Sequence, residues 1–414
     1  MEDVIASERE VQQLAAFDYH IKVRDYFKSR KKTWDWFAKQ ENKEEQNKKY
    51  KAEILKNTYR LEKGDYEKQY KACNEIIKAL NLNASIILYQ ENNSVELNAR
   101  IFILDTEAHI ALSGNVLTLL TDEEFKALMA HELSHYLFTK MDGGDFEITQ
   151  RIILALANDS RSNDAIIETA RLFQLYLELF CDAGALQACN DYKPVIQALV
   201  KMHTGISTVN AESYLKQAKE ILANDKTSSN QFSHPEAYIR SVATSMRHEG
   251  DKDYIKTITT LIEGGIDLNK LDIFRQEKMH NFTYDLLQLL LKPAWMNSAA
   301  IINLCQQYFK DFHKKEKTKS IEEIIEAMND MAPSAINFIA YLFLDISKVD
   351  TNMEGVPMGH TLEVAELLGM KTEYEKVIRK EMNMTIRDFK KMQESAMDDL
   401  QKVSEDKSDS IYTD

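Results

Sequence analysis

Compact runs of apolar residues gather in one stretch of the chain and predict a small β-sheet there. Such runs, bounded by polar residues, are typical of strands. Three of them occur, over residues 85–90, 99–104 and 109–112. Most of the remaining chain has apolar residues at helical spacing, so the pattern predicts a mainly α protein with a small β-sheet, an α+β fold.

A helix start follows the predicted strands. Thr121-Asp-Glu-Glu124 has the form of a capping box, in which the Thr121 side chain accepts from an exposed amide and Glu124 reaches back to the backbone. Apolar residues then follow at helical spacing, at Phe125, Leu128, Met129 and Leu133. The segment after Thr121 is therefore predicted to be a helix.

The pattern divides the chain into four predicted parts. These are a charged helical region over 1–80, a mixed domain with the sheet over 81–248, a helical bundle or solenoid-like domain over 249–404, and a disordered tail over 405–414. Within the mixed domain, helices are expected over 152–156 and 166–186, and polar residues separate them.

Composition supports the helical prediction and narrows the choice of partners. The 414 residues include only 12 glycines and 5 prolines, so residues that break helices are scarce. A formal net charge of −14 argues against nucleic acid as a partner, because binding it needs concentrated positive charge. The basic residues within 28–32 are interpreted as a solvated helix face.

No segment of the sequence predicts export or a membrane span. The first ten residues lack the apolar stretch of a signal peptide, and no run reaches the roughly 18 apolar residues of a membrane helix. The four cysteines show no paired spacing and are predicted to be reduced; they are Cys73, Cys181, Cys189 and Cys305. These features predict a cytoplasmic protein, with non-classical secretion as the alternative.

His131-Glu-Leu-Ser-His135 is the segment with the clearest candidate chemistry. Positions i and i+4 share one face of a helix, so the two imidazoles can bind one ion. Glu132 is offset by about 100° from His131, which directs it toward a water on the metal instead of the metal. Zinc lowers the pKa of that water to about 7, and the carboxylate can then accept its proton. The alternative is a pair of surface histidines that bind no metal.

A catalytic zinc of this kind needs a third protein ligand, and a later helix offers one. Glu178 and Asp182 are four residues apart in an apolar segment, so both side chains point the same way. Glu178 could complete a His₂Glu set, while Asp182 could accept a hydrogen bond from a ligand histidine and fix its tautomer. Buried carboxylates need such partners; the alternative is an exposed acidic edge.

These pieces, in this order, resemble peptidase family M48, the metallopeptidases that include HtpX and the CAAX prenyl proteases. The resemblance rests on Asn98-Ala99, on residues 119–135, on the segment from Glu178 to Asp182, and on Ser233-His-Pro-Glu-Ala-Tyr-Ile-Arg240. It covers about residues 75–245, less than half of the chain. Ser134 stands where the family commonly has glycine, and we expect an exposed helix face to tolerate it.

The resemblance implies a zincin-like domain over 81–248 that acts as a zinc-dependent endopeptidase on protein or peptide substrates. It implies that His131, His135 and Glu178 bind zinc and that Glu132 is the general base. It also implies that Asp182 accepts a hydrogen bond from a ligand histidine without binding the zinc itself.

The resemblance also implies a rim around the metal site. His234 and Arg240 are placed near the reacting groups, where their donors suit stabilisation of the oxyanion. A substrate strand would pair with the edge strand at Asn98 and Ala99. His234 has a second explanation, a His-Pro turn with Pro235 at the first position of a helix.

Two other functions are considered. In the first, the protein is a non-proteolytic interaction protein whose C-terminal helices bind a protein partner. The intact Glu132 argues against this, because a structural zinc site has no need of a base. In the second, the protein is a latent protease whose flanking helices cover the cleft.

Overall fold

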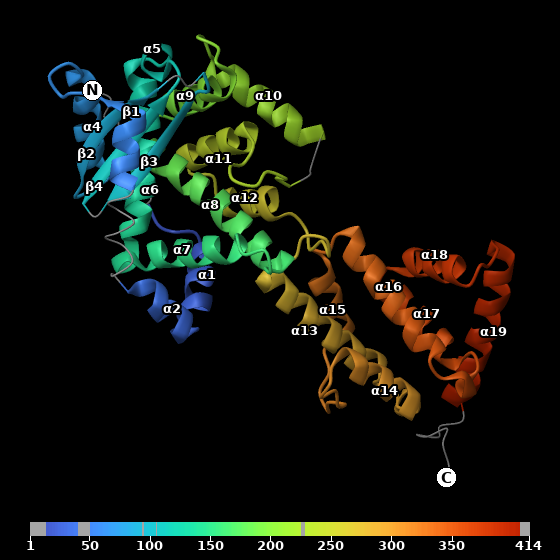
Figure 1. Ribbon diagram of the computed structural model, residues 1–414. Helices are drawn as coiled ribbons and strands as arrows, with labels where there is room; N and C mark the ends of the chain where they lie inside the picture. Colours follow the sequence, from blue (N-terminus) through green and yellow to red (C-terminus); the bar gives the residue numbers. More distant parts are fainter. Residues whose placement is uncertain (1–13, 40–49, 93–94, 105, 225–227, 406–414) are drawn as a thin grey trace, which may run out of the picture. The chain divides into compact units, whose positions relative to one another are not determined.

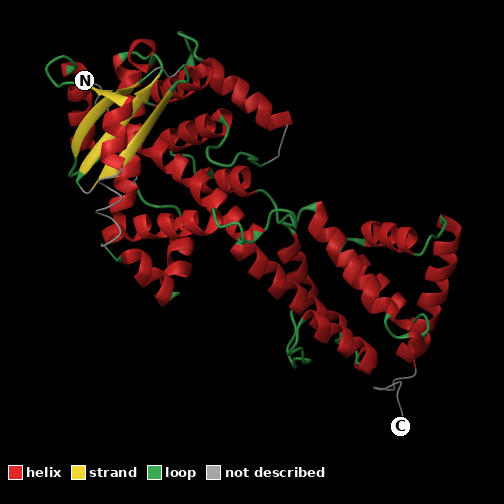
Figure 2. Ribbon diagram, in the orientation of Figure 1, coloured by secondary structure: helices red, strands yellow, loops and turns green. Residues whose placement is uncertain are grey.

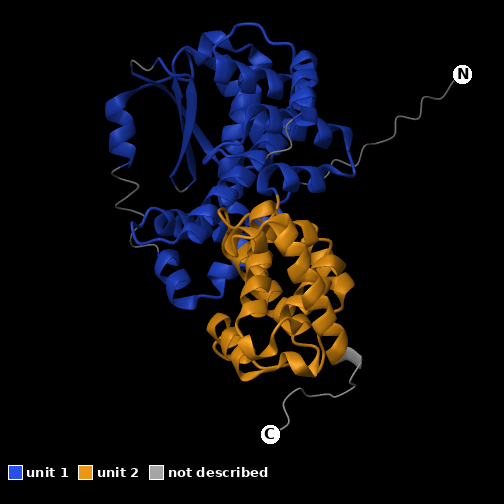
Figure 3. Ribbon diagram, turned by 90° about the vertical axis from the view of Figure 1, so that its right-hand side faces the viewer, with its two compact units in different colours: residues 1–264 blue, residues 265–414 orange. Residues whose placement is uncertain are grey.

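The computed structural model describes residues 14–39, 50–92, 95–104, 106–224 and 228–405 (Figure 1). The chain forms two compact units, residues 1–264 and residues 265–414 (Figure 3). The domain boundaries predicted after residues 80 and 248 stay predictions. Of the predicted tail, only Glu405 is described, as the last residue of a helix, and residues 406–414 lie outside the described residues.

One sheet lies in the first unit (Figure 2). Its order is β1 (Thr58–Arg60), β2 (Ser85–Glu91), β4 (Glu107–Ser113) and β3 (Asn98–Leu104). β2 and β4 are parallel, whereas β1 and β3 pair antiparallel at the two edges. The three predicted strands are thus confirmed, and β3 lies at an edge. The fold class, mainly α with a small β-sheet, is confirmed as well.

The described part of residues 1–80 differs from the long helices that the sequence predicts. It holds the shorter helices α1 (Asp18–Lys28), α2 (Lys31–Ala38) and α4 (Glu67–Ala79), together with the strand β1. β1 has only three residues, none of them buried, so the hydrophobic pattern offers no alternation that predicts it.

The remaining helices of the first unit follow the sheet. They are α5 (Val116–Leu119), α6 (Asp122–Lys140), α7 (Asp145–Ala157), α8 (Asp164–Cys189), α9 (Tyr192–Thr204), α10 (Ala211–Asn224), α11 (Ala237–Glu249) and α12 (Tyr254–Glu263). α6 begins as predicted, because the Glu124 amide donates to Thr121 and the Thr121 amide donates to Glu124. Lys201 of α9 binds the same Glu124 carboxylate at 2.7 Å, which ties α9 to the start of α6.

α6 lies at the centre of the first unit. With α4 it shares one hydrophobic cluster with the sheet, which includes Ile76, Leu88, Ile110, Met129 and Leu133. α8 packs closely on α6 and is buried along most of its length. Ser134 of α6 is fully buried beside Gly184 of α8, so the expectation of an exposed face at Ser134 is wrong. Gly184 lets the backbones of α6 and α8 approach closely at this point.

α1 docks against α6 and α8 through a buried histidine. His20 is fully buried among aromatic rings, with Phe138 and Phe173 both 4.7 Å away between centroids. Its Nε2 lies 3.1 Å from the carbonyl oxygen of Phe173, to which it donates, while Nδ1 has no hydrogen-bond partner among the described residues. Burial lowers the pKa of His20 from 6.5 to about 3, so the neutral ring is the folded form.

Protonation of His20 is expected to destabilise the first unit in mild acid. Because the folded pKa lies below the unfolded value, the stabilisation is complete above pH 6.5 and is lost as the pH falls toward 3. At pH 5 the loss amounts to about 2 kcal/mol. Urea unfolding of the wild type and of His20→Leu at pH 7 and pH 5 measures it. An equal loss in both proteins between the two pH values would refute the assignment.

The described part of the second unit is built of helices around one hydrophobic cluster. The helices are α13 (Ile273–Leu290), α14 (Ala299–Tyr308), α15 (Ile321–Met328), α16 (Pro333–Lys348), α17 (Val356–Leu367), α18 (Lys371–Glu381) and α19 (Ile386–Glu405). This confirms the helical pattern expected after residue 250. Among the described helices of the chain, none is long and apolar enough to cross a membrane.

Candidate metal centre

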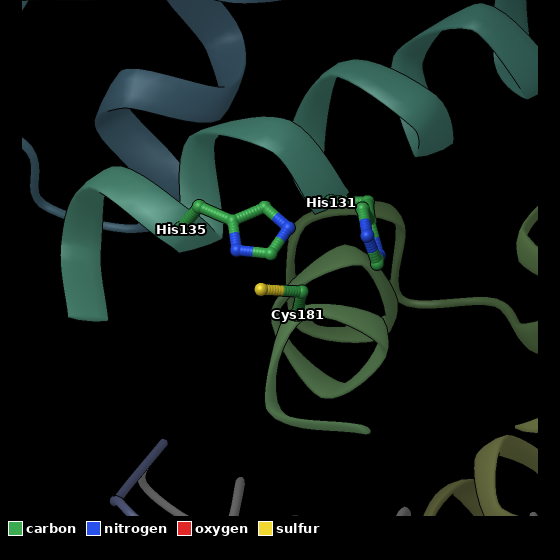
Figure 4. A group of neighbouring side chains, drawn as sticks. All are labelled: His131, His135 and Cys181. Atoms are coloured by element: carbon green, nitrogen blue, oxygen red, sulfur yellow. The ribbon is translucent and has the colours of Figure 1, made fainter. Parts of the chain in front are cut away.

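Two histidines on one face of α6 form the first part of the site (Figure 4). His131 and His135 are one turn apart, and their ring centroids are separated by 5.2 Å. Both side chains are largely buried. The alternative of two surface histidines therefore does not fit the structure.

Glu178 brings a carboxylate from α8 to the same point. Its Oε2 lies 3.3 Å from Nε2 of His131, and its Oε1 lies 3.7 Å from Nε2 of His135. The side chain is only 1% exposed, and Oε2 accepts no hydrogen bond from any described residue. Nη1 of Arg240 lies 3.5 Å from this oxygen and offsets part of its charge, but the oxygen still lacks a hydrogen-bond donor among the described residues, so a cation bound directly to it would be stabilising. Two imidazole nitrogens and this carboxylate are a donor set that suits zinc.

Asp182 and Arg240 hold the first histidine in place. Oδ1 of Asp182 lies 3.0 Å from Nδ1 of His131, which leaves Nε2 of that ring to face Glu178. Arg240 of α11 donates to both oxygens of Asp182 at 2.7 Å, and all three side chains are largely buried. The sequence-based alternative of an exposed acidic edge does not fit these contacts.

Burial and charge together determine the ionisation of these groups. Burial favours neutral carboxyls, but Arg240 and His131 outweigh it, so the pKa of Asp182 is held below its usual range. Burial alone would raise the pKa of Glu178. The hydrogen bond and charge of His131 and the charge of Arg240 outweigh it, so the pKa is lowered and the carboxylate stays charged. No described residue forms such a hydrogen bond with His135, and burial lowers its pKa to about 4. Its neutral ring is the form that binds a metal.

Glu132 lies beside the histidines in the same cleft. It is buried in α6. Burial raises its pKa to about 7, and the nearby Glu178 carboxylate acts in the same direction. A carboxyl with a pKa near neutrality can both accept and donate a proton at neutral pH.

Cys181 is a residue of this site that sequence reasoning missed. Its Sγ and one nitrogen from each of His131 and His135 all lie within 4.8 Å of one another, and Figure 4 shows the sulfur next to the His135 ring. Burial raises the pKa of this thiol well above its usual range. All four cysteines are free, as predicted, but spacing in the sequence gave no sign that Cys181 faces the histidines.

His234 reaches the site from the segment before α11. Its Nε2 lies 3.6 Å from Oε2 of Glu178, and its side chain is 55% exposed to the cleft side. The protein around the ring removes part of its solvent and so lowers the pKa of His234, although the Glu178 carboxylate opposes this effect. α11 begins at Ala237 with Glu236 as its N-cap, so the expected helix start at Pro235 is wrong.

These residues line one cleft of about 1220 Å³. Its walls include the edge strand β3 with Asn98 and Ala99, together with Leu128 and Met202 from α6 and α9. The Ala99 amide donates to Oδ1 of Asn98 at 2.9 Å, so a strand that pairs there would have to displace this side chain. All nine sequence-predicted site residues line this cleft.

Comparisons with known proteins agree on this part of the chain. A family model described as peptidase family M48 matches residues 71–244. The plastoglobule-localized metallopeptidase 48, chloroplastic, of Arabidopsis thaliana is 29% identical over 180 residues, which cover 41% of this chain and 49% of that relative. The chain thus spans about half the length of the relative. No solved structure gave a significant match.

Proposed function

Because this chain carries a domain of peptidase family M48 over residues 71–244, we propose that it is a zinc-dependent endopeptidase. The observation that carries the proposal is the buried carboxylate of Glu178, whose two oxygens face Nε2 of both histidines. The arrangement of Asp182 and Arg240 behind His131 supports it, since such partners orient a ligand ring.

His131, His135 and Glu178 would hold the zinc. When bound, zinc polarises a carbonyl and acidifies water. Cys181 offers a fourth donor beside them, but its thiol is fully buried and its pKa is high, which favours the neutral form. Glu178 is charged and lies on the cleft, so we assign it as the third ligand and Cys181 as a neighbour.

Glu132 would transfer the protons. As a carboxylate it takes a proton from the attacking water, and as a carboxylic acid it returns that proton to the leaving nitrogen of the peptide. Burial raises the pKa of Glu132 above its usual value, which makes it a stronger base than an exposed carboxylate. Because hydrolysis adds water across the bond, the proton that Glu132 accepts is the one that the leaving amine receives.

The rim residues would bind the substrate and its developing charge. His234 is exposed to the cleft and can donate to the oxyanion. Arg240 is buried, pairs with Asp182 and lies 3.5 Å from Oε2 of Glu178, so it would orient the ligands His131 and Glu178. A peptide in extended form would add to the edge of β3 at Asn98 and Ala99. Among these roles, that of Arg240 is therefore one of positioning.

Replacing His135 by Ala is expected to remove stoichiometric zinc and with it casein hydrolysis. The variant leaves one imidazole and one carboxylate, too few donors for a stable zinc site. Native mass spectrometry gives the zinc content, and casein cleavage is followed in the same samples. His203→Ala is the matched control, because His203 lines the cleft but has no contact with Glu178 among those given by the structure.

Two further variants decide the third ligand. Glu178→Ala is expected to lose zinc, and Cys181→Ala is expected to keep it. The reverse result would make Cys181 the ligand. Full zinc content in His135→Ala, or a zinc-loaded wild type that cleaves no protein or peptide, would contradict the proposed function.

A latent form of the same enzyme, and an interaction protein with a protein partner for its C-terminal helices, stay as alternatives. Limited truncation distinguishes them, because a latent protease gains activity when its flanking helices are removed. The cytoplasmic location likewise stays a prediction.

A further inference from the structure

A buried arginine on α8 donates hydrogen bonds to the chain segment that precedes His234. Nη1 of Arg171 donates to the carbonyl oxygen of Ser229 at 3.1 Å and to that of Gln231 at 3.0 Å. Gln231 precedes His234 by three residues. We propose that Arg171 is a positioning residue that fixes the 229–236 segment and thereby the place of His234 over Glu178.

The charge of Arg171 is neutralised within its own helix. Its Nε and Nη2 donate to the two carboxylate oxygens of Glu168, both at 2.7 Å. The bidentate pair is largely buried, and it fixes the plane of the guanidinium. The remaining donor, Nη1, is thus aimed at the two carbonyls in a direction that a lysine could not reproduce.

Further contacts hold the same segment. The Gln231 amide donates to Oγ of Ser229 at 3.3 Å, and Oγ of Ser233 lies 2.8 Å from Nδ1 of His234. The Ser229 amide donates to the carbonyl oxygen of Leu261 at 2.7 Å, and the Asn230 amide donates to Glu236 at 3.4 Å. Ser229 is fully buried. Without Arg171 the buried carbonyl of Ser229 and that of Gln231 lose a charged donor, which is the costly way to break a hydrogen bond.

The geometry of α8 explains why this anchor and the metal site are coupled. Arg171 and Glu178 are seven residues apart, two turns of helix, and therefore lie on the same side of α8. The helix thus sets both the position of the carboxylate and the position of the segment that places His234 at 3.6 Å from it. Sequence reasoning missed Arg171, because one arginine among apolar residues shows no motif.

Hydrogen exchange tests the anchor without reference to activity. In Arg171→Gln, amides of residues 229–236 are expected to exchange at least about tenfold faster, because the opening of that segment becomes easier. Arg161→Gln is the matched control, since Arg161 is an exposed arginine paired with Asp159 just before α8. Unchanged exchange over 229–236 in Arg171→Gln would overturn the proposal.

Kinetics then tests whether the anchor acts through His234, and this part rests on the proposed function. Per bound zinc, Arg171→Gln is expected to lower kcat on a casein-derived peptide by about 10- to 100-fold, with KM changed less than threefold. The double variant with His234→Ala should be no slower than His234→Ala alone. If the loss of kcat in the double variant equalled the product of the two single losses, Arg171 would not act through His234.

The two arms separate the failure of this inference from the failure of the proposed function. If the zinc-loaded wild type hydrolyses no peptide, the proposed function fails, whereas the exchange measurement still decides whether Arg171 holds the segment. If Arg171→Gln does not fold, Arg171→Lys carries the test. It keeps the charge beside Glu168, and it should restore folding but not the slow exchange of residues 229–236.

Discussion

Glu132→Gln is expected to lose peptide hydrolysis by about 10²- to 10⁴-fold while the protein keeps its full zinc content. Glutamine has nearly the shape of glutamate, so the buried site in α6 can accommodate it. It cannot accept a proton at neutral pH, and the transfer from water to the leaving nitrogen is lost. The ligand residues His131, His135 and Glu178 are unchanged, so zinc binding is unaffected.

Glu123→Gln provides the matched control for this result. Glu123 lies on the same helix but is exposed in its first turn. It should change stability by a few tenths of a kcal/mol at most and leave hydrolysis unchanged. Casein cleavage and zinc content are measured together on both variants and on the wild type. If Glu132→Gln cleaved casein as fast as the wild type, Glu132 would not be the base.

Local signals in the sequence were sufficient to predict the elements that build the site. The capping box at Thr121 fixes the start of α6, and the i, i+4 rule then places His131 and His135 on one face. The same rule places Glu178 and Asp182 together on α8. These predictions hold because each depends on residues within one or two helical turns of each other.

Contacts between elements were beyond such reasoning. Cys181 looked like a small buried residue, and only the crossing of α6 and α8 brings its sulfur toward the histidines. Arg171 meets Ser229 across 58 residues of chain, so no local pattern links the two. Ser134 was expected at an exposed face because the hydrophobic pattern of α6 does not show that α8 covers that side.

The crossing of α6 and α8 rests on a glycine that has no room for a side chain. A Cβ atom on Gly184 would lie 1.9 Å from Oγ of Ser134 and 2.8 Å from its Cβ. Oγ of Ser134 cannot simply turn away, because it donates to the carbonyl oxygen of Ala130 at 2.7 Å in a fully buried position. An alanine at 184 must therefore push the two helices apart.

Gly184→Ala is expected to destabilise the first unit by about 3 kcal/mol, at the upper end of the usual cost of overpacking. It should also weaken zinc binding, because Ser134 is next to His135 on α6 and Gly184 is two residues after Asp182 on α8. Urea unfolding and competition with a zinc chelator measure the two effects. Gly64→Ala is the control, since a Cβ there meets nothing within 4 Å.

The cause of this loss can be isolated by a second change in the same contact. Ser134→Gly removes the two atoms that the new Cβ would clash with, and leaves only an ordinary contact with Leu14 at 3.4 Å, so the double variant Ser134→Gly/Gly184→Ala should recover most of the stability and of the zinc affinity. Helix propensity favours the double variant by only about 0.5 kcal/mol, because one helix loses about 0.5 kcal/mol at its new glycine and the other gains about 1 kcal/mol at its alanine. Additive losses in the double variant would mean that helix separation is not the cause. Recovery would show that the helix pair needs one glycine at this crossing, on either helix, to keep the histidines opposite Glu178.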